Sequence, residues 1–147
     1  GAFVAGLLHD LGLLLMATGL PREFERIRQC CLREGTSLVE AERRVIGLDH
    51  AQLTAEALAQ WNLPAPVQRA ARYQLTPEAV ENGVWPLSRV VHFASRLVES
   101  DGLEVQVGLG ERDADRATLL GQVEAPLPWL TLQEEFEREL EPIRAFF

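Results

Sequence analysis

The chain has 147 residues, of which 47% are hydrophobic and 24% are charged, and its formal net charge at pH 7 is −8. The length suits one domain with one core, so we expect a single domain over 1–147, and the hydrophobic content argues against disorder. The negative charge disfavours binding to nucleic acid and to anionic membranes. All 14 basic residues are Arg, which leaves no lysine for a Schiff base, a general base or a phosphate clamp.

The first strongly patterned segment is residues 2–18, where leucines and other apolar residues recur at helical spacing. Leu13 and Met16 extend the apolar surface almost around the helix, so the pattern predicts one central, largely buried helix. A membrane span would need roughly 20 apolar residues, but His9 and Asp10 interrupt the run. No basic segment precedes it, which argues against a signal peptide. We therefore expect a cytoplasmic protein without a membrane contact.

Two further features concern the start of the chain and its cysteines. The helical pattern begins directly after Gly1, so we expect a domain whose first helices lie upstream. Cys30 and Cys31 are adjacent, and neighbours in sequence cannot easily adopt disulfide geometry. Buried, reduced thiols are expected, as in a cytoplasmic protein.

The rest of the first hundred residues is also helical in pattern. Ser37 followed by Glu40 has the spacing of a capping box, and Asp49 is a typical N-cap residue. Gly19, Gly35 and Gly47 fall where helices should end. The expected helices cover approximately residues 21–34, 37–46, 49–61, 65–74 and 87–100.

The helical spacing also predicts which polar side chains face the core and which face solvent. In the helix from 49 to 61, His50, Thr54 and Trp61 share one apolar face. Glu40 and Glu42 lie among other charges and are expected to be solvated. In the helix 87–100 the apolar face is Leu87, Val90, Val91, Ala94, Leu97 and Val98, and the opposite stripe is Ser88, His92, Ser95 and Glu99.

Beyond residue 100 the pattern is weaker. Alternating apolar residues allow a short extended segment near 103–108, and helices are expected over 113–123 and 131–146. Nothing in the sequence requires a sheet. The expected fold class is therefore an all-α helical bundle.

Three histidines, His9, His50 and His92, are the main candidates for chemistry. With Asp10 they offer nitrogen and carboxylate ligands suited to Mg, Mn, Fe or Zn, and a catalytic metal centre needs about three protein ligands and an open position. The alternative is a satisfied polar network in the core, with Asp49 serving only as a cap. Phosphate loops, nucleophile elbows, Cys-x-x-Cys and His-Glu-x-x-His motifs are absent from the sequence.

The segment AFVAGLLHDLG, residues 2–12, resembles the AFLAGLLHDIG signature of HDOD domains, regulatory relatives of the HD superfamily of metal-dependent phosphohydrolases. The resemblance is strongest over residues 2–98. It implies an HD-like helical bundle with several helices before the signature, a region that supplies a further histidine ligand in active HD enzymes. The other matching segments are 40–43, 47–51, 61–64, 71–73 and 91–94.

The departures from the family pattern bear on activity. A His-His pair often follows the segment matching residues 71–73, whereas this chain has Gln74 and Leu75. Leu cannot bind a metal and an amide is a poor ligand. Active HD phosphodiesterases resemble this chain around His92 but have Asp there, and they often have Lys at the place of Leu13.

The resemblance and its departures together favour a non-catalytic regulatory module of a bacterial signalling protein. It would act through a protein partner, an attached signalling domain or a signal ligand, with a homo-oligomer as one form, and no cofactor is expected. The alternative is a metal-dependent phosphohydrolase or phosphodiesterase. His9, Asp10, His50 and His92 would then hold a divalent ion (Mn, Fe, Mg or Zn) with ligands from outside the chain.

Overall fold

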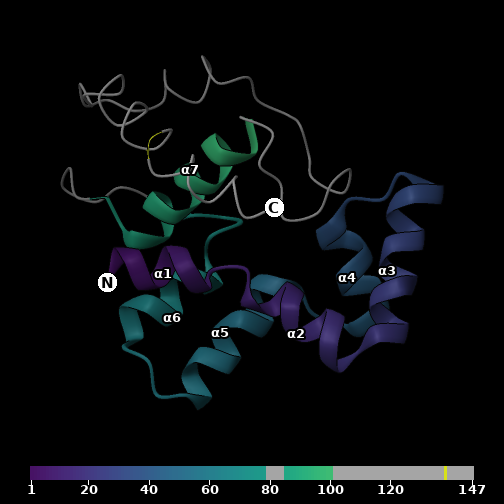
Figure 1. Ribbon diagram of the computed structural model, residues 1–147, viewed down its shortest axis with the longest axis horizontal. Coiled ribbons are helices and arrows are strands. Elements are labelled where there is room, and N and C mark those ends of the chain that lie inside the picture. Colours follow the sequence, from purple (N-terminus) through teal and green to yellow (C-terminus); the bar gives the residue numbers. More distant parts are fainter. Residues whose placement is uncertain (79–84, 101–137, 139–147) are drawn as a thin grey trace. The chain divides into compact units, whose positions relative to one another are not determined.

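The structure is a computed structural model, which describes residues 1–78, 85–100 and 138. The chain separates into two compact units, residues 1–116 and 117–147. The seven helices with described bounds belong to the first unit, and the described residues form no strand, so the predicted all-α fold is confirmed (Figure 1). The segments 103–108, 113–123 and 131–146 lie outside the described residues. A single domain over 1–147 stays a prediction.

The helix boundaries follow from local signals in the sequence. Ser37 Oγ accepts a hydrogen bond from the Glu40 amide at 3.3 Å, and Asp49 and Gln52 form a reciprocal capping box. Gly35 and Gly47 end their helices at positive φ, 67° and 85°, a conformation that glycine adopts without strain. The helices are α1 (Ala2–Leu8), α2 (Leu11–Gly19), α3 (Pro21–Glu34), α4 (Leu38–Ile46), α5 (His50–Gln60), α6 (Ala65–Arg72) and α7 (Leu87–Ser100).

The prediction of one unbroken helix over residues 2–18 is wrong, because the chain leaves the helix at His9 and Asp10. The Gly12 amide donates to Thr54 Oγ1 of α5 at 2.8 Å, instead of to the carbonyl four residues earlier. The Leu13 amide bonds to the Asp10 carbonyl at 2.9 Å, a tighter turn. A side chain inserted into the helical ladder is a common cause of such breaks.

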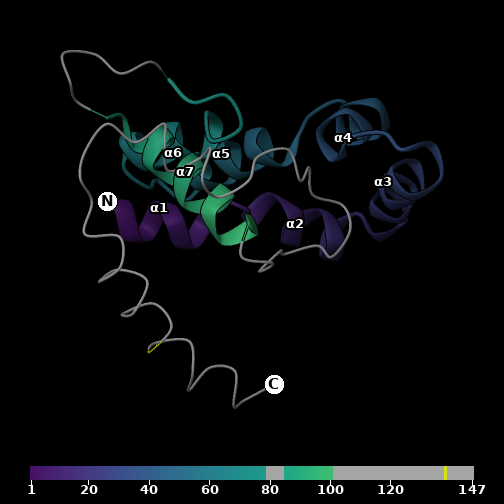
Figure 2. The same ribbon diagram turned by 90° about the horizontal axis from the view of Figure 1, so that it is seen from above.

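The apolar residues form two clusters, one at each end of the described helices. Helices α1, α6 and α7 gather at one end and α3 and α4 at the other, while α2 and α5 cross between them (Figures 1 and 2). The first cluster is centred on Ala5, Leu58, Val67, Ala70, Ala71 and Val91, and the second on Leu13, Met16, Ile27, Cys30 and Ala41. The α2–α5 crossing, where the polar residues meet, therefore joins the two clusters.

Several expected faces are corrected by the structure. The stretch 2–19 is not a buried core helix, since Phe3, Leu7 and Leu14 are 80%, 69% and 60% exposed. By length and composition Ala2–Gly19, with mean hydropathy 1.6, could cross a membrane, a test that core helices of globular proteins also meet. Trp61 is exposed rather than inward, because α5 ends at Gln60 and Trp61 caps it.

The inward face of α7 is only partly the one that its pattern predicts, since Val91 is buried as expected. Ser88 is buried and His92 is half-buried, whereas Val90 and Val98 are exposed. The Ser88 hydroxyl donates to Glu78 at 3.3 Å, so a polar contact draws this face of α7 inward. Both cysteines are free, as predicted; Cys30 is buried and Cys31 is half-buried.

Candidate functional site

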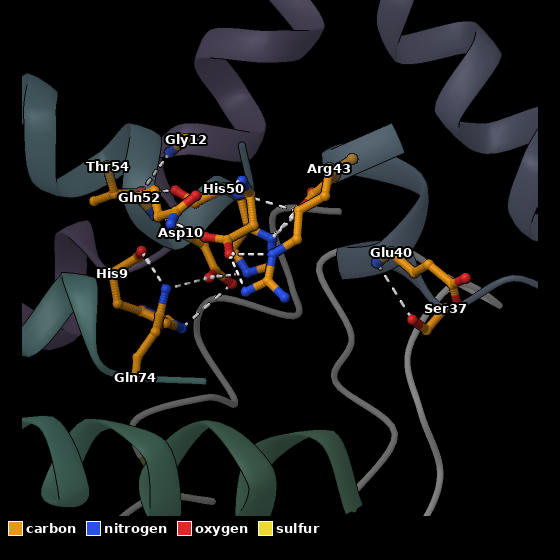
Figure 3. Close-up of polar contacts among 12 residues, drawn as sticks. His9, Asp10, Gly12, Ser37, Glu40, Arg43, His50, Gln52, Thr54 and Gln74 are labelled. Carbon is orange, nitrogen blue, oxygen red and sulfur yellow. Dashed lines mark hydrogen bonds and ion pairs between the residues drawn. The ribbon is translucent and has the colours of Figure 1, made fainter. Parts of the chain in front are cut away.

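The α1–α2 break brings Asp10 to the centre of a polar cluster (Figure 3). One carboxylate oxygen, Oδ2, lies 3.3 Å from His9 Nε2. The other, Oδ1, lies 3.9 Å from His50 Nε2 and accepts a hydrogen bond from the Gln74 amide at 3.4 Å. The expected burial of His9 and Asp10 is only partial, since their side chains are 20% and 23% exposed. The His9–Asp10 pair is thus partly buried and contacts two other side chains, those of His50 and Gln74.

His50 forms a second, fully enclosed ion pair on the other side of its ring. Its Nδ1 donates to Glu42 Oε2 at 2.8 Å, and its backbone amide donates to the same oxygen at 3.0 Å. Glu42 is 0% exposed, so its predicted solvation is wrong. The signal was present in the spacing, because Glu42 is four residues from both Leu38 and Ile46 and adjoins Ala41. It therefore lies on the apolar face of α4.

The carboxylates around His50 raise its pKa. Burial alone lowers the pKa of His50, but the hydrogen bond and charge of Glu42 raise it, and Asp10 and Asp49 add to the rise. The net result is a pKa above the ordinary value of 6.5. Asp49 is itself paired with Arg43, whose Nη2 lies 2.7 Å from Oδ2. Buried carboxylate groups thus favour the imidazolium form.

We expect the free energy of unfolding to fall as the pH rises from 6.5 through the raised pKa of His50. The folded chain binds the His50 proton more tightly than the unfolded chain, so this stabilisation is complete below the unfolded pKa and is lost above the folded one. Urea unfolding at several values between about pH 6 and pH 9 would measure it. Glu42→Gln should flatten the slope. An equally steep slope in that variant would exclude the Glu42–His50 pair as its source.

Gln74 and His92 complete the cluster. Gln74 is 4% exposed, and its Nε2 donates to the His9 carbonyl at 2.7 Å as well as to Asp10. His92 Nδ1 donates to the Gln74 carbonyl at 2.6 Å, so this nitrogen is turned to the main chain. The structure therefore brings His9, Asp10, His50 and Gln74 together, with His92 joined through the Gln74 backbone. Leu75 is half-buried beside them.

The chemistry of these donor atoms determines how well the cluster would fit a divalent ion. Within the described ranges, no three or more His, Cys, Asp or Glu side chains form a group that could hold a metal ion. The Gln74 amide points an N–H at Asp10 Oδ1, where an ion would need the lone pair of that oxygen. The Nδ1 of His50 donates to Glu42, which leaves its Nε2 as the ring nitrogen that faces Asp10. The group that does not fit a divalent ion is the Gln74 amide, whose N–H occupies Asp10 Oδ1.

Comparison with known proteins shows that most of this cluster lies in a region that matches a known family. A family model described as HDOD domain matches residues 1–77, which is more than half of the 147 residues. The matched region contains every residue of the cluster except His92. Neither a curated protein nor a solved structure matches the chain.

Proposed function

Because the chain belongs to the HDOD domain family, we propose that it is a non-catalytic regulatory module of a bacterial cytoplasmic signalling protein. It would act by binding a protein partner, an attached signalling domain or a signal ligand. The observation that supports this is the state of Asp10, whose two oxygens face His9 on one side and Gln74 and His50 on the other. This arrangement supports a role of Asp10 in joining the helices rather than in holding a substrate-activating ion.

The exposed apolar face of α1 and α2 supports binding to a protein. Phe3, Val4, Leu7 and Leu14 are all exposed, and the first three lie within two turns of one helix. Contiguous apolar surface on a soluble domain commonly marks an interaction site. In a solution of the chain alone, the partner available to this face is a second copy.

We expect the chain to self-associate at high concentration and Leu7→Ser to weaken that association by about tenfold or more. The change exposes a hydroxyl where Leu7, 69% exposed, offers apolar surface. Sedimentation velocity over a concentration series would measure it. Leu32→Ser on α3 is the matched control, since Leu32 is 62% exposed on another helix. Equal effects of the two changes would exclude α1 as the contact.

One observation favours the alternative, a metal-dependent phosphohydrolase of the HD superfamily. The Nε2 atoms of His9 and His50 both face the Asp10 carboxylate, and imidazole nitrogen with carboxylate oxygen is a ligand set used by divalent ions. Under this alternative Gln74 would have to withdraw from Asp10. The role of the carboxylate would then change from joining helices to holding an ion.

The two functions are separated by assay. The chain, and the longer protein that contains it, would be incubated with cyclic dinucleotides and generic phosphodiesters in the presence of Mn, Mg or Fe, and its metal content would be measured by mass spectrometry. We expect no turnover and less than one tightly bound ion per chain. Turnover that is abolished by His9→Ala or Asp10→Ala, but not by Glu40→Ala on the exposed face of α4, would establish the hydrolase instead.

A further inference from the structure

Three parts of the fold meet at Gln74, two residues beyond the end of α6. Its side-chain amide contacts the α1–α2 break through the His9 carbonyl and Asp10 Oδ1. Its main-chain carbonyl accepts the hydrogen bond from His92 of α7. One nearly buried residue therefore contacts both the break and α7, through different atoms.

The helix break creates the need for this contact. In an unbroken helix the His9 carbonyl would accept from the Leu13 amide, but that amide bonds to Asp10. The His9 carbonyl is left without its helical partner, and the Gln74 amide supplies the hydrogen bond at 2.7 Å. A carbonyl deprived of this bond in a half-buried place costs free energy. The junction and Gln74 should consequently hold each other in position.

On the other side, apolar packing holds α7 against the rest of the fold. Val91 and Leu87 pack into the first apolar cluster, which fixes the distance of α7 but is not directional. The hydrogen bond from His92 to Gln74 is directional, at 2.6 Å. The orientation of α7 therefore depends in part on where the Gln74 backbone lies, together with the hydrogen bond from Ser88 to Glu78 at 3.3 Å.

We propose that Gln74 couples the His9–Asp10 junction to α7, so that an event that draws Asp10 or the His9 carbonyl away from Gln74 loosens α7. The junction has one exposed flank, since the His9 and Asp10 side chains are partly open to solvent. A ligand or partner that engages them competes with the Gln74 amide. As a route of regulation this rests on the proposed function, whereas the coupling itself can be measured without any ligand.

The test is amide hydrogen exchange of the full 147-residue chain, followed by mass spectrometry or NMR. Gln74→Ala removes the amide but keeps the carbonyl that His92 contacts. We expect about tenfold faster exchange both at the Gly12 and Leu13 amides and in the middle of α7. The matched control is Gln68→Ala, since Gln68 Nε2 makes its hydrogen bond to the Leu63 carbonyl, just before α6, at 2.7 Å. Faster exchange at the junction with α7 unchanged would overturn the coupling.

A second variant removes the hydrogen bond on the α7 side of Gln74. His92→Phe keeps a ring against Phe93, whose contact is edge-on at 5.8 Å, but removes the donor to Gln74. Because coupling between sites is reciprocal, the Gly12 and Leu13 amides should exchange faster in this variant as well. If Gln74→Ala unfolds the chain, shown by exchange of α3 and α4 amides, this variant decides alone. Unchanged exchange at Gly12 and Leu13 would then refute the coupling, and neither result depends on catalysis or partner binding.

Discussion

Gly12→Ala is expected to lower the free energy of unfolding by about 3 kcal/mol. A Cβ on Gly12 would overlap the His50 carbonyl oxygen and would lie 2.9 Å from both the His50 carbonyl carbon and Thr54 Oγ1. The obstacle is main chain of α5, which cannot rotate away as a flexible side chain would. The two helices must separate, and the hydrogen bond from the Gly12 amide to Thr54 would weaken at the same time.

Urea unfolding followed by circular dichroism would measure the loss. Gly6→Ala is the matched control in the same apolar stretch, because a Cβ there meets no atom within 4 Å. A helical glycine replaced by alanine without a clash should gain roughly 0.5–1 kcal/mol. Opposite signs for the two substitutions are therefore expected. A loss of similar size in both would mean that helix propensity or chain solubility, and not the α2–α5 contact, determines the result.

Glu42→Ala should cost about 3–5 kcal/mol, because it removes one partner of a buried ion pair. The His50 Nδ1–H and backbone amide would both lose their acceptor inside the fold. The chain would respond by neutralising the imidazole or by admitting water, and either response weakens the packing of α4 against α5.

Glu40→Ala provides the comparison, since Glu40 lies two residues away on the exposed side of α4. Surface substitutions of this kind usually change stability by less than about 0.5 kcal/mol. Thermal unfolding at pH 6, below the raised pKa of His50, should give the largest contrast. If both variants had the melting temperature of the parent chain, the buried pair between Glu42 and His50 would make no contribution to stability.

Much of the fold could be predicted because its signals are local. Proline and glycine positions and the caps at Ser37 and Asp49 depend only on residues within four places of each other. They defined the boundaries of α3, α4 and α5 to within a residue or two. The polar residues around His50 were partly identified for the same reason, since His9 and Asp10 interrupt an otherwise apolar run.

What could not be predicted depends on partners distant in sequence. The break at His9 requires the hydroxyl of Thr54, 42 residues from Gly12, and no local pattern signals that contact. The role of Gln74 depends on the His9 carbonyl 65 residues away. Glu42 differs, since its place on the apolar stripe of α4 was visible in the sequence, but Arg43 and Arg44 directly after it suggested a charged surface. The helical spacing of Glu42 from Leu38 and Ile46 was a better guide to its burial than the charges beside it.

The long separation between Gly12 and Thr54 also has a consequence during synthesis on the ribosome. The stretch Ala2–Gly19, with mean hydropathy 1.6, emerges before α5 exists to pack against it. At about 5–20 residues per second, the α5 residues follow several seconds later. Until then α3 and α4 can pair with each other through nearby contacts, while the apolar stretch lacks its native contacts with α5, α6 and α7. The nascent chain is therefore expected to need a chaperone in this interval, and slow codons before residue 50 should lower the yield of soluble protein.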